Sequence, residues 1–198
     1  MSYFSAEHEE LRQTIRKFVE TELAPHAHEW EADAYFADWV FPRMGELGYL
    51  GLHYPLEYGG QGGDYFASVV LSEEMARSRC GGLGMAVAVQ TDMATPPVLK
   101  FGTEAQKQKY LVPAIKGEKV ACLGITEPNA GSDVQNVQTW ARPDGDDWII
   151  NGSKIFITNG IRADFITLVA RTDRGRGFEG VTLFLVDCDT PGFRDARL

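Results

Sequence analysis

Cysteine is scarce in this sequence of 198 residues, which contains only Cys80, Cys122 and Cys188. Their number is odd, they lie far apart, and no two of them have the CxxC spacing. These features argue against a disulfide framework and against a thiolate metal site. We therefore predict a chain without a bound metal, suited to a reducing compartment.

Long apolar runs are also missing, and so is an excess of positive charge. No run reaches the roughly 18 apolar residues that a membrane-spanning helix needs, so the sequence predicts no membrane span. Lys and Arg total 19 against 28 Asp and Glu, giving a formal net charge of −9. Nucleic-acid binding depends on clustered basic residues, so no nucleic-acid partner is expected. A phosphate-bearing cofactor held by backbone N–H groups stays compatible with this charge.

The first ten residues do not resemble a targeting segment. They include Glu7, Glu9 and Glu10. A signal peptide would have a basic start followed by an apolar stretch, and a mitochondrial presequence would be rich in Arg and poor in acids. The expected location is the cytoplasm.

What the sequence does contain is a globular composition and a change of pattern near Gly117. Hydrophobic residues make up 44% and aromatic residues 11%, which excludes a wholly disordered chain. Before Gly117 the apolar residues recur at helical spacing, and after it short apolar runs alternate with turn signals. The prediction is an α+β fold: an all-α helical domain over residues 1–116, followed by an incomplete antiparallel β-barrel domain over residues 117–198.

Three predicted helices begin at capping residues. Ser5 and Asp64 are suited to the N-cap position, and Thr103 forms a capping box with Gln106. Pro25 ends or restarts the first helix. Two shorter helices are expected over 26–37 and 38–47. In the helices that begin after Ser5 and Asp64, the residues expected to face the core are Leu11, Ile15, Phe18, Val19, Leu23, Phe66, Val69, Val70 and Met75.

Several polar or glycine-rich patterns in the first half have ordinary structural explanations. Gly82-Leu83-Gly84 lacks a preceding strand, so a helix-breaking turn explains it better than a phosphate loop. Glu73-Glu74 is more typical of a solvated helix face than of a catalytic dyad. His26 and His28 are two apart and would diverge on a helix, whereas His8 and His53 stand alone.

The second half is expected to hold six strands. Asn151-Gly152 predicts the turn of a hairpin, and Pro143-Asp144-Gly145 is a second turn signal. The expected strands are Val120–Ile125, Val134–Ala141, Trp148–Ile150, Lys154–Thr158, Phe165–Ala170 and Val181–Val186.

The predicted strand Lys154–Thr158 could bind a planar ring system. Side chains alternate along a strand, so Phe156 and Thr158 would share one face. One could stack on a ring while the other makes a hydrogen bond to its edge. Ordinary packing, with the Phe in a core and the Thr at a rim, explains the same pattern.

The segment Thr126–Asp133 could bind an anion. Its backbone can turn successive N–H groups toward a ligand, and Gly131 permits close approach. It lies between two strands, which excludes a Rossmann or Walker phosphate loop. A tight surface turn, with Ser132 and Asp133 bonded to nearby backbone, is the alternative.

The segments Thr126–Asp133 and Asn151–Gly160 together resemble the two signature segments of the acyl-CoA dehydrogenase family. Tyr54–Gly63 and Phe101–Leu111 are similar to further segments of that family, so the resemblance covers essentially the whole chain. It implies a helical domain, a β-barrel and a C-terminal four-helix bundle, with FAD as cofactor. The cofactor-binding residues that it implies are Leu123, Gly124, Ile125, Thr126, Gly131, Ser132, Phe156, Ile157 and Thr158; Ser132 would also contact the acyl-CoA substrate.

The implied reaction is α,β-dehydrogenation of an acyl-CoA thioester to the trans-2-enoyl-CoA, as part of fatty-acid oxidation. The family's catalytic Glu lies in the C-terminal bundle, which this chain lacks, so no catalytic residue is expected here and Glu127 is no substitute. We expect the N-terminal portion of a longer enzyme, or one piece of a split one. An acyl-CoA oxidase, a flavin monooxygenase of the same superfamily and a non-catalytic acyl-CoA-binding homologue stay open.

The resemblance also implies partners. The electron acceptor would be an electron-transfer flavoprotein, and the full-length protein would be a homo-oligomer, a tetramer. The segment from Leu83 toward Pro97 would lie near the acyl tail.

Overall fold

A computed structural model of the chain describes residues 3–175, 177 and 179–195. The chain divides into two compact units, Met1–Val120 and Ala121–Leu198. The predicted domain limits, 1–116 and 117–198, stay a prediction. Within the described residues, no helix is both long and apolar enough to span a bilayer.

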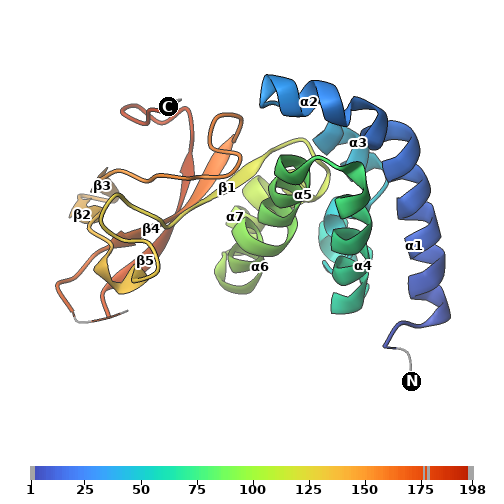
Figure 1. The fold of residues 1–198 in the computed structure, drawn as a ribbon. Coiled ribbons are helices and arrows are strands. Elements are labelled where there is room, and N and C mark those ends of the chain that lie inside the picture. Colours follow the sequence, from blue (N-terminus) through green and yellow to red (C-terminus); the bar gives the residue numbers. More distant parts are fainter. Residues whose placement is uncertain (1–2, 176, 178, 196–198) are drawn as a thin grey trace. The chain divides into compact units, whose positions relative to one another are not determined.

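All secondary-structure elements described in the first unit are helices (Figure 1). Three of its segments are π-helical (η1, η6 and η7), and η2–η5 are short 3-10 helices. Its elements are α1 (Ala6–Phe18), η1 (Val19–Leu23), η2 (Ala24–His26), α2 (Ala27–Asp33), α3 (Val40–Glu46), η3 (Tyr49–Gly51), η4 (Leu56–Tyr58), α4 (Tyr65–Met75), η5 (Ala76–Ser78), α5 (Gly81–Ala88), η6 (Val89–Ala94), α6 (Pro96–Phe101), α7 (Glu104–Gln106), η7 (Lys107–Leu111) and α8 (Val112–Ile115).

The predicted caps start these helices. The Ser5 side chain accepts from the backbone N–H of His8, and Asp64 accepts from the N–H groups of Phe66 and Ala67. The Thr103–Gln106 capping box is also present. Because these bonds satisfy N–H groups that have no partner inside the helix, they fix where each helix begins.

The apolar stripe of α1 and η1 packs into the core of the helical unit, as predicted. Ile15, Val19 and Leu23 are completely buried, and Phe18 is nearly so. The α4 stripe is only partly as expected, since Val70 and Met75 are buried but Phe66 is 38% exposed. Phe66 instead lies against other aromatic rings near the start of α1.

Two predictions for the helical unit are wrong. Gly82-Leu83-Gly84 is not a turn, because it lies inside α5; the break comes earlier, where Arg79 has a left-handed backbone with φ +60°. Glu74 does not lie on a solvated face. It is 2% exposed and faces arginines of α1, so tertiary contact overrides what the local pattern of α4 indicates.

The second unit is built on one five-stranded sheet (Figure 1). β4 lies at its centre and pairs with β1, β2 and β5, and β3 pairs with β2. The elements are β1 (Ala121–Gly124), the 3-10 turn η8 (Val134–Asn136), β2 (Trp140–Asp144), β3 (Asp147–Asn151), β4 (Phe165–Arg171) and β5 (Val181–Asp187).

The sheet is mixed, so the prediction of an antiparallel barrel is wrong in its strand directions. β1 pairs with β4 in parallel, from Ala121 opposite Phe165 to Gly124 opposite Leu168. Parallel neighbours need a long connection, here residues 125–164, and a pattern of adjacent runs and turns does not predict it. The described strands form an open path, and a closed barrel is not confirmed.

The hairpin turn does not lie at Asn151-Gly152, where the sequence predicted it. It lies at Gly145 (φ +65°), between β2 and β3, where the second turn signal predicted a turn. Position 152 requires glycine for a reason other than a turn, because a Cβ there would lie 2.7 Å from the Cα of Thr139. The Asn-Gly pair thus reflects a close approach of two backbones, and no strand follows it before β4.

The predicted strand over residues 134–141 begins only at Trp140. The guanidinium of Arg171 donates to the carbonyl oxygens of Gln135 and Val137. A side chain therefore satisfies carbonyls that a strand would present to a neighbouring strand, and residues 134–136 form a 3-10 turn.

Candidate functional site

The two segments with candidate binding residues meet in the second unit. The N–H of Ile155 donates to the carbonyl oxygen of Thr126 at 2.9 Å. The Lys154 ammonium donates to the carbonyl oxygen of Ile125 at 3.0 Å, although the two residues are 29 positions apart in sequence. The structure therefore brings the end of β1 and the segment 154–158 side by side.

A buried ion pair joins these segments. Nζ of Lys154 lies 2.7 Å from Oε1 of Glu127, and the two side chains are 8% and 5% exposed. Glu127 also accepts hydrogen bonds from the N–H groups of Gln138 and Thr139, at 2.6 and 2.9 Å, and from the Thr139 hydroxyl at 2.5 Å. Both carboxylate oxygens are thus engaged.

These contacts shift the pKa values of both partners. Burial by itself would raise the pKa of Glu127, but the bonds from Lys154, Thr139 and Gln138 outweigh it and hold this pKa at about 2. Burial lowers the pKa of Lys154, and the nearby carboxylate opposes that shift. Glu127 is therefore ionised at neutral pH and accepts four hydrogen bonds.

The segment 154–159 is not a strand, so the prediction that Phe156 and Thr158 share a strand face is wrong. Phe156 has a left-handed backbone with φ +57°, and 82% of its surface is exposed. Asn159, also left-handed at φ +67°, is buried and donates from Nδ2 to the carbonyl oxygen of Ala121 at 3.1 Å. Asn159 is thus tied to β1 and Ile155 to Thr126 just beyond it, and the Phe156 ring between them points into open space.

The loop Thr126–Asp133 is a compact turn. The N–H of Glu127 donates to the carbonyl oxygen of Ala130, and the reverse bond is also present, at 2.9 and 3.1 Å. Gly131 and Ser132 are exposed, and a Cβ added at Gly131 would meet no atom within 4 Å. Side-chain bonds such as that from Asn136 to Asp133 shape this loop, so it has features of both alternatives, the surface turn and the open backbone.

The predicted binding residues differ in exposure. Phe156, Gly131 and Ser132 are exposed, and Gly124 is buried against Ile166. The half-buried members of the set are Leu123, Ile125, Thr126, Ile157 and Thr158.

Sequence reasoning missed the framework beneath these residues. Lys154, Thr139 and Asn159 carried no assigned role, and Glu127 was considered only as a base. The available signal was one anionic and one cationic side chain, Glu127 and Lys154. Each lies in a segment of mostly small or apolar residues. Only the fold shows that the two meet.

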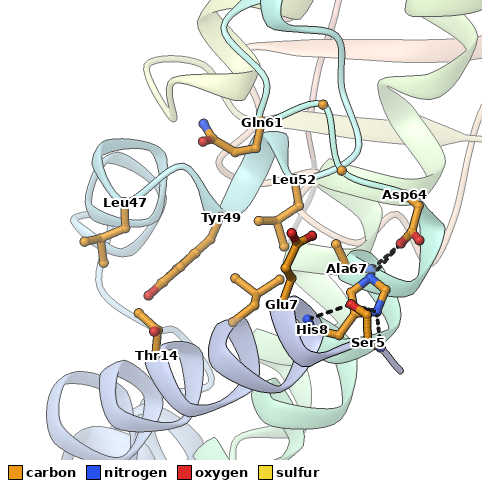
Figure 2. Close-up of a pocket in the computed structure, with 13 residues that line it drawn as sticks. Ser5, Glu7, His8, Thr14, Leu47, Tyr49, Leu52, Gln61, Asp64 and Ala67 are labelled. Carbon is orange, nitrogen blue, oxygen red and sulfur yellow. Dashed lines mark hydrogen bonds and ion pairs between the residues drawn. The ribbon is translucent and has the colours of Figure 1, made fainter. Parts of the chain in front are cut away.

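The helical unit contains a cavity of about 730 Å³ between α1, the segment around Tyr49 and the loop before α4 (Figure 2). At its rim, Nε2 of His8 lies 2.9 Å from Oδ1 of Asp64, so His8 does not stand alone as expected. Leu11 and Leu52 contribute apolar surface. No predicted cofactor-binding residue lines this cavity.

Another buried polar cluster holds the segment expected near an acyl tail. The Tyr54 hydroxyl donates to the carbonyl oxygen of Thr91 and lies within hydrogen-bond distance of the Thr95 hydroxyl, both at 2.7 Å. Burial raises the pKa of Tyr54. Gln90 donates to the carbonyl oxygens of Ala114 and Lys119. These bonds tie the π-helical η6 to its neighbours.

No group of three or more potential metal ligands occurs in the part of the chain that the structure describes.

Comparison with known proteins gives two family matches. Residues 5–118 match the model of the acyl-CoA dehydrogenase N-terminal domain, and residues 122–198 match that of the middle domain. The chain is 42% identical to the short-chain specific acyl-CoA dehydrogenase of Clostridium acetobutylicum, covering 94% of the chain and 49% of the relative. It is 39% identical to the mitochondrial long-chain specific enzyme of Mus musculus, covering 98% and 45%. The chain thus spans about half the length of these curated relatives.

Solved structures are similar over the same extent. One, which describes the electron transferring flavoprotein of Acidaminococcus fermentans, includes a chain that is 36% identical with a TM-score of 0.94, covering 100% of this chain and 52% of that one. Another is a glutaryl-CoA dehydrogenase from Mycobacterium smegmatis in complex with FADH2. It is 34% identical with a TM-score of 0.89, covering 96% and 47%.

Proposed function

The chain belongs to the acyl-CoA dehydrogenase family, and we propose that it supplies part of the FAD site and part of the acyl-CoA site of an enzyme that dehydrogenates acyl-CoA thioesters. The observation that carries the proposal is the junction of the loop Thr126–Asp133 with the segment 154–158. The relatives named short-chain and long-chain acyl-CoA dehydrogenase, and the relative in complex with FADH2, support it.

The residues at this junction fit a flavin. The exposed Phe156 ring offers a flat apolar surface, and the half-buried Thr126 and Thr158 carry hydroxyl groups in the same two segments. The open space at Gly131 leaves room for close approach to the backbone. FAD, when bound, supplies the two-electron redox chemistry of the reaction. This chain would bind and orient it, while Ser132 would contact both cofactor and acyl-CoA.

We assign no catalytic base to the described residues of this chain. A base must have a pKa near the working pH and a free oxygen. Glu127 meets neither requirement, because its carboxylate accepts four hydrogen bonds and its pKa is about 2. We propose that the base comes from a further polypeptide segment, as the family resemblance implies.

Three finer proposals accompany this one. The solved structure that describes an electron transferring flavoprotein supports such a protein as the electron acceptor. The tetramer rests on the family resemblance. A closed barrel would require further strands, and β5, which pairs with β4 alone among the described strands, offers a free edge for one. The cytoplasmic location stays a prediction, since one relative named above is mitochondrial.

The test is a titration of the isotope-labelled chain with FAD, followed by amide chemical shifts in NMR spectra. The expected shifts lie at residues 123–126, 131–132 and 156–158, and they shrink in the variant Phe156→Ala. Folded protein without shifts at millimolar FAD, or with shifts confined to the helical unit, contradicts the proposal. After anaerobic addition of butyryl-CoA the flavin should stay oxidised, and bleaching would contradict the assignment of the base to another segment.

A further inference from the structure

We propose that the buried pair of Glu127 and Lys154 acts as a positioning device, which sets Thr126 and Phe156 in the places from which they contact the flavin ring. This inference rests on the proposed function, since it assumes that these residues meet a flavin. Neither member of the pair is assigned a catalytic role.

Sequence neighbours of the pair are the proposed contact residues. Glu127 directly follows Thr126, and Lys154 stands two residues before Phe156. The Lys154 ammonium holds both the Glu127 carboxylate and the carbonyl oxygen of Ile125, so one cation fixes the path of the chain before and after Thr126. The bond from Ile155 to Thr126 completes the junction. A shift of either partner would therefore move a contact residue.

The backbone at Phe156 explains why such a device is needed. A left-handed conformation is unfavourable for a bulky residue and persists only where the surroundings impose it. Lys154 and Ile155 anchor the chain before Phe156, and Asn159 anchors it after. The exposed ring itself gains little from packing in this chain. The conformation is therefore held by the anchors and not by the ring.

Thr139 supplies a second connection to the same segment. Its N–H and hydroxyl both donate to Glu127, and its Cα would lie 2.7 Å from a Cβ at Gly152. Thr139 thus touches the segment just before Lys154 while it also holds the acid. The pair is embedded in a network that crosses three chain segments.

An ion pair differs from apolar packing in what it specifies. Replacing both members of a buried pair by neutral groups of similar volume is often harmless to stability, whereas removing one member leaves a buried charge and is costly. The directed hydrogen bonds of the pair are lost whether one member or both are replaced, because a methionine has no donor to hold a carbonyl oxygen at a fixed place. Stability and positioning can therefore be separated by experiment.

The experiment compares Glu127→Gln, Lys154→Met, their double variant and Lys154→Arg in the full chain. Three quantities are measured: the midpoint of denaturant unfolding, the hydrogen exchange of individual amides without flavin, and FAD affinity from NMR titration. The exposed ion pair of Arg142 with Asp144, on β2, provides the matched control Arg142→Met.

The double variant should recover stability relative to the single variants but still bind FAD about tenfold to a hundredfold more weakly, as expected for misplaced contact groups. Lys154→Arg, which keeps the charge and the donors, should stay within about threefold of the wild type. Arg142→Met should leave the affinity unchanged. A double variant that regains both stability and affinity overturns the proposal, because the pair would then be only structural.

The exchange measurement needs no flavin. In Lys154→Met, protection of the Ile155 amide should fall about tenfold more than protection of the β4 amides. Equal loss in β4, or no loss at Ile155, overturns the positioning role. A wild-type chain that takes up no FAD contradicts the proposed function instead, and the exchange result then still decides whether the pair holds the segment.

Discussion

Each unit buries a glutamate among its described residues, and the two are neutralised in different ways. Glu74 in α4 has a side chain that is 3% exposed, and its partners Arg12 and Arg16 in α1 are 15% and 41% exposed. Glu127 has a partner, Lys154, that is itself 8% exposed, and three further bonds come from residues 138 and 139. The helical unit places its cations near water, whereas the sheet unit buries both charges.

The difference separates two uses of a buried carboxylate. The arginines around Glu74 join α1 to α4, two neighbouring helices in Figure 1. Arg12 also pairs with Glu9 and Glu73, so it keeps anionic partners if Glu74 is lost. The Lys154 side chain is less exposed than either arginine, so Glu127 rather than water compensates its charge. A pair of this kind costs desolvation energy, and it is better explained by what it positions than by a gain in stability.

Removing the buried cation should have the largest effect. Lys154→Met leaves the Glu127 carboxylate in a site that is 5% exposed, and we expect a loss of about 3–5 kcal/mol in the free energy of unfolding. Denaturant unfolding measures it. Arg142→Met, in the exposed pair, should change stability by at most about 0.5 kcal/mol. Equal losses in the two variants would remove the distinction between buried and exposed pairs.

Acid should weaken the Glu127 pair next. The folded pKa of Glu127 is about 2, below the ordinary value of 4.5 for a glutamate. The acid therefore stabilises the fold above pH 4.5, and this contribution, on the order of 3 kcal/mol, is lost as the pH falls from 4.5 toward 2. Unfolding midpoints measured across this range should fall steeply in the wild type. They should fall less in the Glu127→Gln, Lys154→Met double variant, and parallel curves would be the contrary result.

Neutralising the acid of the helical unit should cost less than breaking the Glu127 pair. Glu74→Gln weakens hydrogen bonds from Arg12 and Arg16, and we expect a loss of about 1.5–3 kcal/mol. The arginines are partly exposed, so water compensates for part of the loss. The same unfolding assay compares it with Lys154→Met. A larger loss for Glu74→Gln would reverse the ranking of the two units.

Two glycine-to-alanine variants, one beside the Glu127–Lys154 pair and one in the helical unit, should change stability in opposite directions. Gly152→Ala forces a Cβ against Thr139, which holds Glu127, and should cost about 1–3 kcal/mol. Gly84→Ala in α5 meets no atom within 4 Å and should stabilise the helical unit by about 0.5–1 kcal/mol. Thermal unfolding followed by circular dichroism distinguishes the two. A stabilising Gly152→Ala would show that the close approach at Thr139 is absent in solution.

Sequence patterns predicted the helical unit better than the sheet unit. The caps at Ser5, Asp64 and Thr103 and the buried stripe of α1 follow from bonds and contacts between residues a few positions apart. The sheet depends on distant pairs, such as β1 with β4, and on the side chain of Arg171, which replaces strand bonds by bonds to carbonyl oxygens. A local pattern carries no information about such pairs.

By itself the sequence determined the helix starts at Ser5, Asp64 and Thr103, the turn at Gly145 and the two segments that identify the family, since each depends on residues close together in the chain. It also contained the candidate contact residues from Leu123 to Thr158. Only the tertiary structure decided that Phe156 is left-handed and exposed, and that Glu127 and Lys154 form a buried pair. The physical reason is that these features depend on a charge and its counter-charge far apart in sequence, which meet only when the sheet has formed.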